Sequence, residues 1–187
     1  MNRLPPVVTL RPSTLADADV IAGWGSDDAF CRAADWTVGL PPDRLLAFHR
    51  SLVTDPPIGL LRLSVVHECH VVGYVDLHGT DPGRSELGFL IGPRERWGRG
   101  FGLAAAQAGV RHGFDVLGLD EIWAEALDAN RASVRILEKI GMIETGRGDD
   151  GHHLGRPTFH RQFCLTRPVG LAHTPVWASN SATGTGV

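Results

Sequence analysis

One stretch of this sequence constrains the fold most strongly: an apolar segment runs directly into a glycine-rich turn and then into an alanine-rich segment. The apolar segment covers residues 85–91 and ends at Gly92-Pro93, and the alanine-rich segment covers residues 100–117. This succession predicts a strand, a tight loop and a helix. Glycines at positions 98, 100 and 102 let the backbone approach a ligand, and the free amides of a new helix favour an anion such as phosphate. The stretch therefore predicts a phosphate-binding turn, and the alternative is a tight turn with solvated arginines.

The remaining segments alternate between strand-like and helix-like patterns. Apolar, β-branched runs predict strands, and apolar residues at helical spacing predict helices. Turn-like residues at 67–70 and 79–83 separate three consecutive strands, which we expect to form an antiparallel meander. The order predicts an α/β (α+β) fold with a mixed, mostly antiparallel central sheet and helices on both faces. The expected strands are 7–12, 60–66, 71–78, 85–91, 121–127, 142–146 and 158–165, and the expected helices are 15–24, 41–53, 100–117 and 129–140.

The domain organisation follows from where the composition changes. A chain of 187 residues can bury a sizeable core, and it contains no repeat and no linker that would separate two domains. After Arg167-Pro168 the residues are small and polar, which is typical of a segment with too little apolar side chain to fold by itself. We expect a single domain over residues 5–168 and a C-terminal tail over residues 169–187.

Charge and hydropathy argue against two classes of partner. The formal net charge is −3, whereas domains that bind nucleic acid through charge carry a basic excess. No apolar run approaches the roughly 20 residues of a membrane span, and the first residues do not resemble a signal-peptide core. We therefore expect no nucleic-acid partner, no membrane partner and a cytoplasmic location.

Cysteines and histidines have spacings that do not indicate a metal site. Three widely spaced cysteines suit reduced thiols in the core better than a disulfide framework or a zinc site. Two histidine pairs lie in expected loops without a cysteine or acidic partner at metal spacing. We therefore expect no metal, structural cysteines and solvated histidines; the residues are Cys31, Cys69 and Cys164, and His67, His70, His152 and His153.

The glycine-rich stretch has neither the Walker pattern of nucleotide-binding loops nor the glycine pattern of dinucleotide-binding folds. It resembles a different phosphate-binding motif. Residues 86–105 resemble the acyl-coenzyme A (CoA) binding motif of the GNAT superfamily of N-acetyltransferases. The run Trp97-Gly98-Arg99-Gly100-Phe101-Gly102 resembles the RimJ/RimL-like branch, the ribosomal-protein N-terminal acetyltransferases. Residues 113–125 and 130–142 resemble the strand and the Asn-x-x-Ser helix of that branch. Ala104 and Met142 depart from the branch, which often has Glu and Phe there, and Trp97 departs only from the wider superfamily.

The resemblance implies a GNAT-type fold and an acyl-CoA-dependent N-acyltransferase with acetyl-CoA as its cosubstrate and no metal. It implies that backbone amides of the loop hold the pyrophosphate and that a strand edge pairs with the pantetheine arm. The amide near Ile91 would polarise the thioester carbonyl. The cofactor-binding residues implied are Phe89, Leu90, Ile91, Arg96, Trp97, Gly98, Arg99, Gly100, Phe101, Gly102, Leu103, Asn130, Ser133 and Arg135.

Catalytic roles are assigned through the same resemblance, each beside a structural alternative. Glu86 matches an acidic position of the branch and is our candidate general base; otherwise it is a strand carboxylate paired with Arg84. Ser133 could protonate the leaving thiolate, or it packs. Asn130 matches a pantetheine contact and is also a natural helix N-cap. Tyr74, the single tyrosine, lies inside a strand, so we expect its ring in the core.

The sequence signal is weakest for the residues that would bind the amine acceptor. Asp76 and His78 share one face of the strand before Glu86, and Trp36 lies where acceptor walls form in this fold, so these three are candidate substrate-binding residues. We expect the acceptor to be a primary amine on a small molecule or a peptide, attacking the acetyl group directly. A longer acyl donor such as succinyl, or a silent CoA-binding module, is the alternative, and a homodimer is possible.

Overall fold

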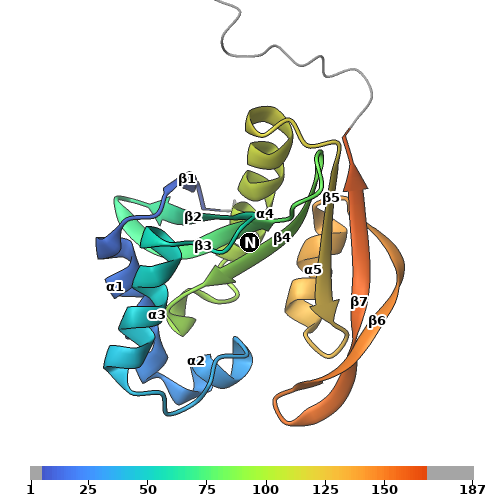
Figure 1. The fold of residues 1–187 in the computed structure, drawn as a ribbon. Coiled ribbons are helices and arrows are strands. Elements are labelled where there is room, and N and C mark those ends of the chain that lie inside the picture. The colour runs from blue at the N-terminus through green and yellow to red at the C-terminus, as the bar shows by residue number, and fades with distance from the viewer. Residues whose placement is uncertain (1–5, 168–187) are drawn as a thin grey trace, which may run out of the picture.

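Residues 6–167, which the computed structural model describes, contain one seven-stranded mixed sheet (Figure 1). The strand order is β1-β2-β3-β4-β5-β7-β6, and the β4–β5 pair is parallel whereas the other neighbours are antiparallel. The strands are β1 (Thr9–Pro12), β2 (Leu60–His67), β3 (His70–His78), β4 (Arg84–Ile91), β5 (Glu121–Leu127), β6 (Ile143–His153) and β7 (Arg156–Thr166).

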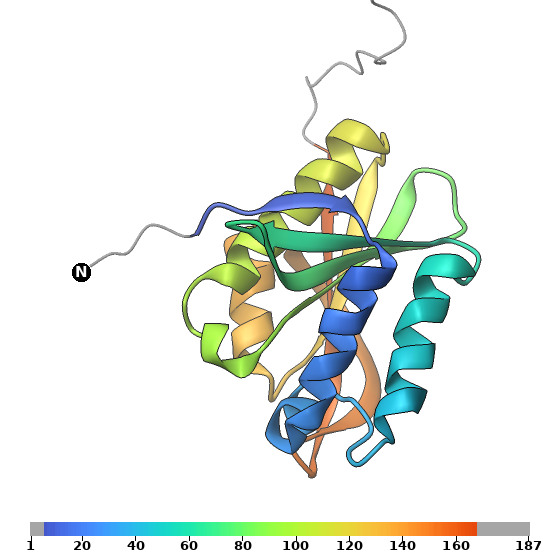
Figure 2. The same cartoon turned by 90° about the vertical axis from the view of Figure 1, so that its left-hand side faces the viewer.

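Helices cover both faces of this sheet, as the sequence predicts. Helices α1 and α3 lie side by side over one face, with α2 beyond the end of α1 (Figure 2). Helices α4 and α5 pack on the opposite face. The bounds are α1 (Leu15–Gly23), α2 (Asp28–Ala33), α3 (Pro42–Thr54), α4 (Phe101–Arg111) and α5 (Arg131–Lys139), with short turns η1 (Trp24–Ser26), η2 (Arg94–Arg96) and the π-helical η3 (His112–Val116).

The two faces of the sheet bury separate apolar clusters because successive strand residues point to opposite sides. The larger cluster lies under α4 and α5 and includes Val75, Leu87 and Ile122. The smaller cluster lies under α1 and α2 and is built on Ile21, Trp24, Phe30 and Cys31, with Tyr74 and Leu90 of the sheet packed against it. The ring of Tyr74 therefore lies in a core, as predicted, and Trp24 is a core residue.

Local sequence signals explain where several elements begin and end. The hydroxyl of Thr14 and the carboxylate of Asp17 form a reciprocal capping box at the start of α1. Gly141 adopts φ +90° after α5, a conformation that favours glycine at a helix C-terminus. No helix among residues 6–167 is long and apolar enough to cross a membrane.

Several expected boundaries were wrong. The six-residue helix α2 was not predicted, the helix expected to reach residue 117 becomes π-helical at His112, and the last two strands are much longer than expected. Consequently His67, His70, His152 and His153 end or begin strands and are not loop residues. The tail expected at 169–187 lies outside the described residues.

The prediction that all three cysteines are core residues was also wrong. Cys31 is buried and Cys164 is half-buried, but Cys69 is exposed. Cys69 lies with Glu68 in the two-residue turn between β2 and β3, and both residues have positive φ, at +64° and +47°. A two-residue hairpin turn of this kind projects its side chains outward.

Candidate functional site

The sheet splits in the middle, between β4 and β5. The two strands pair over only three positions, Arg84 to Glu86 against Glu121 to Trp123, and then diverge (Figure 1). Beyond Glu86, the side of β4 that faced β5 has no strand beside it. The split therefore creates an open backbone edge along the last five residues of β4.

The backbone groups on this open edge can be identified from the register with β3. The amide of Gly92 donates to the carbonyl of Val72 at 3.1 Å, so Gly92 directs its groups toward β3. In an antiparallel pair, neighbouring residues direct their N–H and C=O groups to opposite sides. Phe89 and Ile91 therefore present theirs to the open edge, where an extended amide-bearing chain could pair with them.

The loop that follows this edge leads into α4 through two glycines in the left-handed region of backbone space. Gly98 and Gly100 have φ of +70° and +89°, a backbone region that residues other than glycine rarely adopt. Gly100 is the N-cap of α4, and no side chain within residues 6–167 caps that helix. The first N–H groups of α4 are thus left without a side-chain partner, which is the arrangement that binds phosphate at a helix N-terminus.

Gly102 also lies at a packing contact between α4 and α5. A Cβ on Gly102 would lie 2.8 Å from Cδ1 of Ile136 in α5. The absence of a side chain there permits close packing of the two helices, beside the ligand-admitting role that its place in the motif indicates. Leu103, the next residue, is half-buried in the same turn.

The three arginines of the loop are not equivalent. Arg94 forms an ion pair with Asp27, the N-cap of α2, so its charge is already partnered. Arg96 donates to the carbonyl of Gly92 at 3.3 Å. Arg99 is exposed, with its guanidinium 5.9 Å from the ring of Phe101. Arg96 and Arg99 remain the candidates for a phosphate contact, and Arg135 is exposed on α5.

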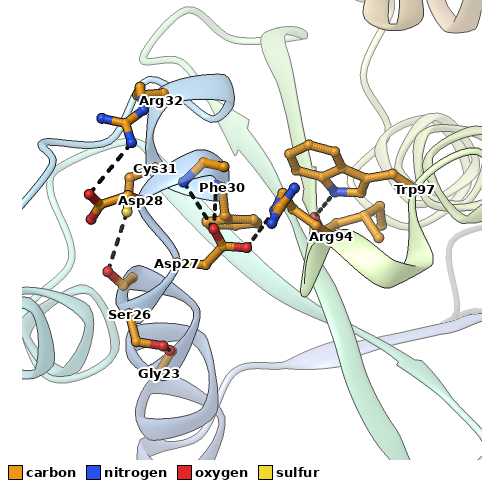
Figure 3. A network of polar contacts seen from close by, with 12 residues as sticks. Gly23, Ser26, Asp27, Asp28, Phe30, Cys31, Arg32, Arg94 and Trp97 are labelled. Atoms are coloured by element: carbon orange, nitrogen blue, oxygen red, sulfur yellow. Dashed lines mark hydrogen bonds and ion pairs between the residues drawn. The ribbon is translucent and has the colours of Figure 1, made fainter.

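Trp97 joins the loop to the open edge. Its indole N–H donates to the carbonyl of Ile91 at 2.7 Å, and its ring lies 5.7 Å from that of Phe30 (Figure 3). One hydrogen-bond acceptor of the edge is thereby occupied by the loop itself. The amide of Ile91, on the same side of the strand, is left to face the split.

Glu86 lies where the split begins. Its carboxylate is half-buried and has no hydrogen bond or ion pair among residues 6–167; the alternative partner Arg84 is instead bound to Glu121 at 2.5 Å. Burial, and then the negative charge of Glu125, raise the pKa of Glu86, while His78 and His160 lower it less. A half-buried carboxylate with a raised pKa is suited to accept a proton.

Two cavities adjoin Glu86. One, of about 290 Å³, is also lined by Pro57, Leu60, Asp76, His78 and Gly88. The other, of about 310 Å³, is also lined by His78, Gly79, Thr80, Asp81, Arg84 and Trp123. His78 is the cross-strand partner of Glu86 and borders both cavities. Asp76 and His78 therefore share one face of β3, as predicted, and Glu86 lies beside them on the next strand.

Asp76 is not a free carboxylate. Arg62 of β2 binds it through two hydrogen bonds, of 2.8 and 2.6 Å, and the side chains of the pair are only 11% and 19% exposed. The same guanidinium lies 3.9 Å from the ring centroid of Tyr74. The charge of Asp76 is thus neutralised within the protein, so this carboxylate is not a free partner for a cationic amine, although it lines a cavity beside Glu86.

Asn130 and Ser133 lie together at the start of α5. The side-chain oxygen of Asn130 accepts from the amide of Ser133 at 3.2 Å, so Asn130 is the N-cap, one of the two roles expected for it. The hydroxyl of Ser133 is half-buried on the helix that flanks the split.

Trp36 stands at a third cavity, of about 230 Å³, between the segment after α2 and the tip of the β6–β7 hairpin. Its ring centroid lies 4.8 Å from that of His49 of α3, with the ring planes tilted by 40°, and Nδ1 of His49 is buried without a hydrogen-bond partner among residues 6–167. Burial, with the positive charge of Arg62 second, lowers the pKa of His49 to about 4. No group of three side chains suited to hold a metal ion occurs among residues 6–167.

Sequence reasoning missed four residues of the site: Asp27, His49, Arg62 and Glu125. Arg62 and Asp76 are cross-strand partners in the predicted meander, so pairing the two strands in register could have found that ion pair. Glu125 shares a face of β5 with Trp123. Asp27 and His49 act across contacts between distant segments, for which the sequence carries no local signal.

Comparison with known proteins gives a consistent result. The family model described as the acetyltransferase (GNAT) domain matches residues 8–143. An uncharacterised N-acetyltransferase, p20, of Bacillus licheniformis is 28% identical over 145 residues, which are 74% of this chain and 80% of the relative. The solved structure of Vibrio cholerae spermidine N-acetyltransferase with CoA and spermine superposes with a TM-score of 0.72 at 20% identity, over 85% of this chain and 95% of the other. A GNAT-family acetyltransferase of Bacillus anthracis gives 0.71 at 20% identity, over 87% and 96%.

Proposed function

Since this chain belongs to the GNAT family of acetyltransferases, we propose that it transfers the acetyl group of acetyl-CoA to the primary amine of a small molecule by direct attack. As a GNAT enzyme it is an acyl-CoA-dependent N-acyltransferase. The observation that carries the proposal is Glu86, a half-buried carboxylate without a partner among residues 6–167, at the point where β4 and β5 separate.

The donor site fits the residues on the open edge and in the loop. Gly98 and Gly100, both with positive φ, and the start of α4, which no side chain among residues 6–167 caps, provide amides for a pyrophosphate. The outward N–H and C=O of Phe89 pair with the amides of the pantetheine arm. Bound acetyl-CoA supplies a thioester carbonyl that an amine can attack. Arg96 and Arg99 add positive charge beside the loop, and Arg135 adds it from α5.

The chain's own groups then assist each part of the transfer. Glu86 accepts the proton that the ammonium must lose before its nitrogen can attack the carbonyl carbon. The N–H of Ile91 donates to the oxygen that becomes negative as the new C–N bond forms. When the C–S bond breaks, the hydroxyl of Ser133 donates a proton to the departing thiolate. The serine oxygen then takes the remaining proton from the nitrogen of the new amide, and Glu86 releases its proton to solvent, so charge and protons balance and no acyl-enzyme is needed.

The amine acceptor enters from the face that carries α1 to α3, where the three cavities lie. His78 borders both cavities beside Glu86, and Trp36 borders the third. The uncompensated charges near Glu86 are acidic, because Arg62 and Arg84 are each paired, so a cationic amine is favoured. The similarity to the Vibrio cholerae spermidine N-acetyltransferase supports a small amine as the acceptor class.

Three finer assignments belong to the same proposal. The run from Trp97 to Gly102 supports the RimJ/RimL-like branch. We place the enzyme in the cytoplasm, where acetyl-CoA is available to it, and assign it a homodimer, which light scattering of the purified protein would test. Peptide N-termini remain part of the acceptor panel because that branch acts on them.

Replacement of Glu86 tests the proposal. We expect Glu86→Gln to lower the rate with the best amine of a panel by about two to four orders of magnitude. Calorimetric affinity for acetyl-CoA should stay within twofold, because the donor contacts are backbone groups of other residues. Glu68→Gln, an exposed glutamate in a distant turn, is the matched control. A Gln variant with the wild-type rate would refute the base, and absence of acetyl-CoA binding by the wild type would refute the donor site.

A further inference from the structure

Two contacts fasten the loop before α4 to helix α2, on the other side of the sheet. The first is ionic. Arg94 of the loop donates through Nε to the carboxylate of Asp27 (Figure 3). The same carboxylate accepts from the amides of Ala29 and Phe30 at 2.9 and 3.2 Å, and so caps α2. One side chain thus holds both the start of a helix and the loop.

The second contact is aromatic. Phe30 of α2 has no exposed surface, and its ring centroid lies 5.7 Å from that of Trp97. Trp97 in turn donates to the carbonyl of Ile91, the last residue of the open edge. A movement of Trp97 or of the loop would therefore change the contacts of α2.

Helix α2 continues directly into the acceptor side. The ring of Trp36 lies 5.1 Å from Phe30 in an edge-to-face arrangement. Arg32, Asp35 and Trp36 line one wall of the cavity whose other wall is the β6–β7 hairpin. Phe30 consequently contacts the donor loop on one side and the acceptor wall on the other.

We propose that Asp27 and Phe30 are positioning residues that couple the two substrate sites: occupation of the donor loop orders α2, and with it the acceptor wall. This inference rests on the proposed donor site. Coupling between two sites is reciprocal, so a docked α2 also strengthens binding of the donor by the same factor. The coupling element is a short helix held at its cap, not a change of fold.

The expected size of the coupling follows from how far the ion pair of Arg94 and Asp27 is exposed to solvent. The side chains of Arg94 and Asp27 are 44% and 33% exposed. Such ion pairs contribute at most a factor of about five to an equilibrium. The contact between Phe30 and Trp97 remains when the ion pair is removed. Loss of the pair should therefore weaken the coupling several-fold without abolishing it.

Hydrogen exchange with free CoA as the probe measures this coupling directly. In the wild type, we expect saturating CoA to slow exchange both in residues 96–105 and in residues 29–36. Asp27→Asn retains an N-cap, because asparagine caps as well as aspartate, but removes the charge that Arg94 binds. Arg94→Gln removes the pair from the other side and leaves the cap untouched. Each variant should reduce the CoA-induced slowing in residues 29–36 by up to about fivefold, and the double variant should add nothing further.

Asp28→Asn is the matched control. Asp28 is in the first turn of the same helix and pairs only with Arg32, at 3.5 Å, within residues 6–167. It changes the charge at the helix start by the same amount without touching the loop, so the slowing should equal that of the wild type. If Asp27→Asn and Arg94→Gln reduce the slowing in residues 29–36 equally, a direct effect of Arg94 on the phosphates of CoA is excluded, because Asp27→Asn keeps the positive charge of Arg94.

Each result has one meaning. Undiminished slowing of residues 29–36 in both variants overturns the coupling, and so does CoA binding to the wild type that slows residues 96–105 alone. If CoA slows neither segment and calorimetry shows no binding, the donor site itself is refuted and the coupling falls with it. The pattern across the two segments therefore separates the two failures.

Discussion

The buried pair of Arg62 and Asp76 provides the sharpest quantitative prediction. Its two hydrogen bonds are 2.8 and 2.6 Å long, and only 11% and 19% of the two side chains is exposed. Removing one partner of a well-buried pair leaves an uncompensated charge and typically costs 3–5 kcal/mol. Because water still reaches Asp76, we expect Arg62→Met to cost about 3 kcal/mol, at the lower end. For a domain of this size that corresponds to a melting temperature about 6–12 °C lower.

Urea unfolding of single and double variants tests the cause. If the unpaired charge is responsible, Asp76→Leu in the Arg62→Met background should recover about 2 kcal/mol. The pair of Arg50 and Asp19 has the same two-bond geometry, at 2.7 and 2.8 Å, but lies in solvent. Arg50→Met should therefore leave the urea midpoint within experimental scatter. A loss below 1 kcal/mol for Arg62→Met, or no recovery in the double variant, would contradict the reasoning.

The same pair decides between two roles for Asp76. If its carboxylate held the ammonium of the acceptor, the charge-balanced double variant Arg62→Met, Asp76→Leu would raise the KM for the amine by tenfold or more, about the worth of one ion pair in a site. Because Arg62 already neutralises Asp76, we expect the joint removal of both charges to change this KM by less than about threefold. Steady-state kinetics with the best amine of the panel separates these outcomes, with the KM for acetyl-CoA as the internal control.

Three further predictions follow from titration and glycine geometry. The pKa of His49 falls to about 4 on folding, so the stability that its neutral form contributes is complete above pH 6.5 and is lost as pH falls. The free energy of unfolding should therefore drop by about 2 kcal/mol between pH 7 and pH 5. This drop should vanish in His49→Leu. Glu125→Gln removes a charge that raises the pKa of Glu86, so the acid limb of kcat/KM should move to lower pH, and an unmoved limb would refute the assignment. Gly100→Ala, at φ +89°, should weaken acetyl-CoA binding severalfold in calorimetry, whereas Gly102→Ala should lower the urea midpoint and leave that affinity unchanged.

Local patterns carried most of the fold. The strand, glycine turn and helix of residues 85–117 were predictable because apolar periodicity and punctuation lie within one continuous stretch. Helix α2 was missed because six residues give no measurable periodicity, and its start depends on Asp27, whose cap is shared with the distant Arg94. The last hairpin was predicted too short because Gly146 and Gly148 interrupt the alternation of strand residues where the register with β7 shifts.

The parts of the candidate site that are formed by backbone groups were predictable from the sequence. Residues 97–103 lie in the loop and first turn that the motif indicates, and Glu86 lies in the strand expected at residues 85–91. Partnerships between side chains were not predictable, because whether Arg84 binds Glu86 or Glu121 depends on how far β4 and β5 stay together. The packing role of Gly102 required the position of Ile136 in a helix 34 residues away.

The split sheet also acts as a lever. Three paired positions at one end of β4 form its pivot, and Glu86 is the last of them. The five residues from Leu87 to Ile91 extend about 17 Å from that pivot. A relative rotation of about 5° between the two halves would then move the far end by about 1.5 Å and leave the pivot almost still. If the open edge holds the donor as proposed, small rotations would widen the split for its entry and exit, while Glu86, at the pivot, would keep its distance from β5.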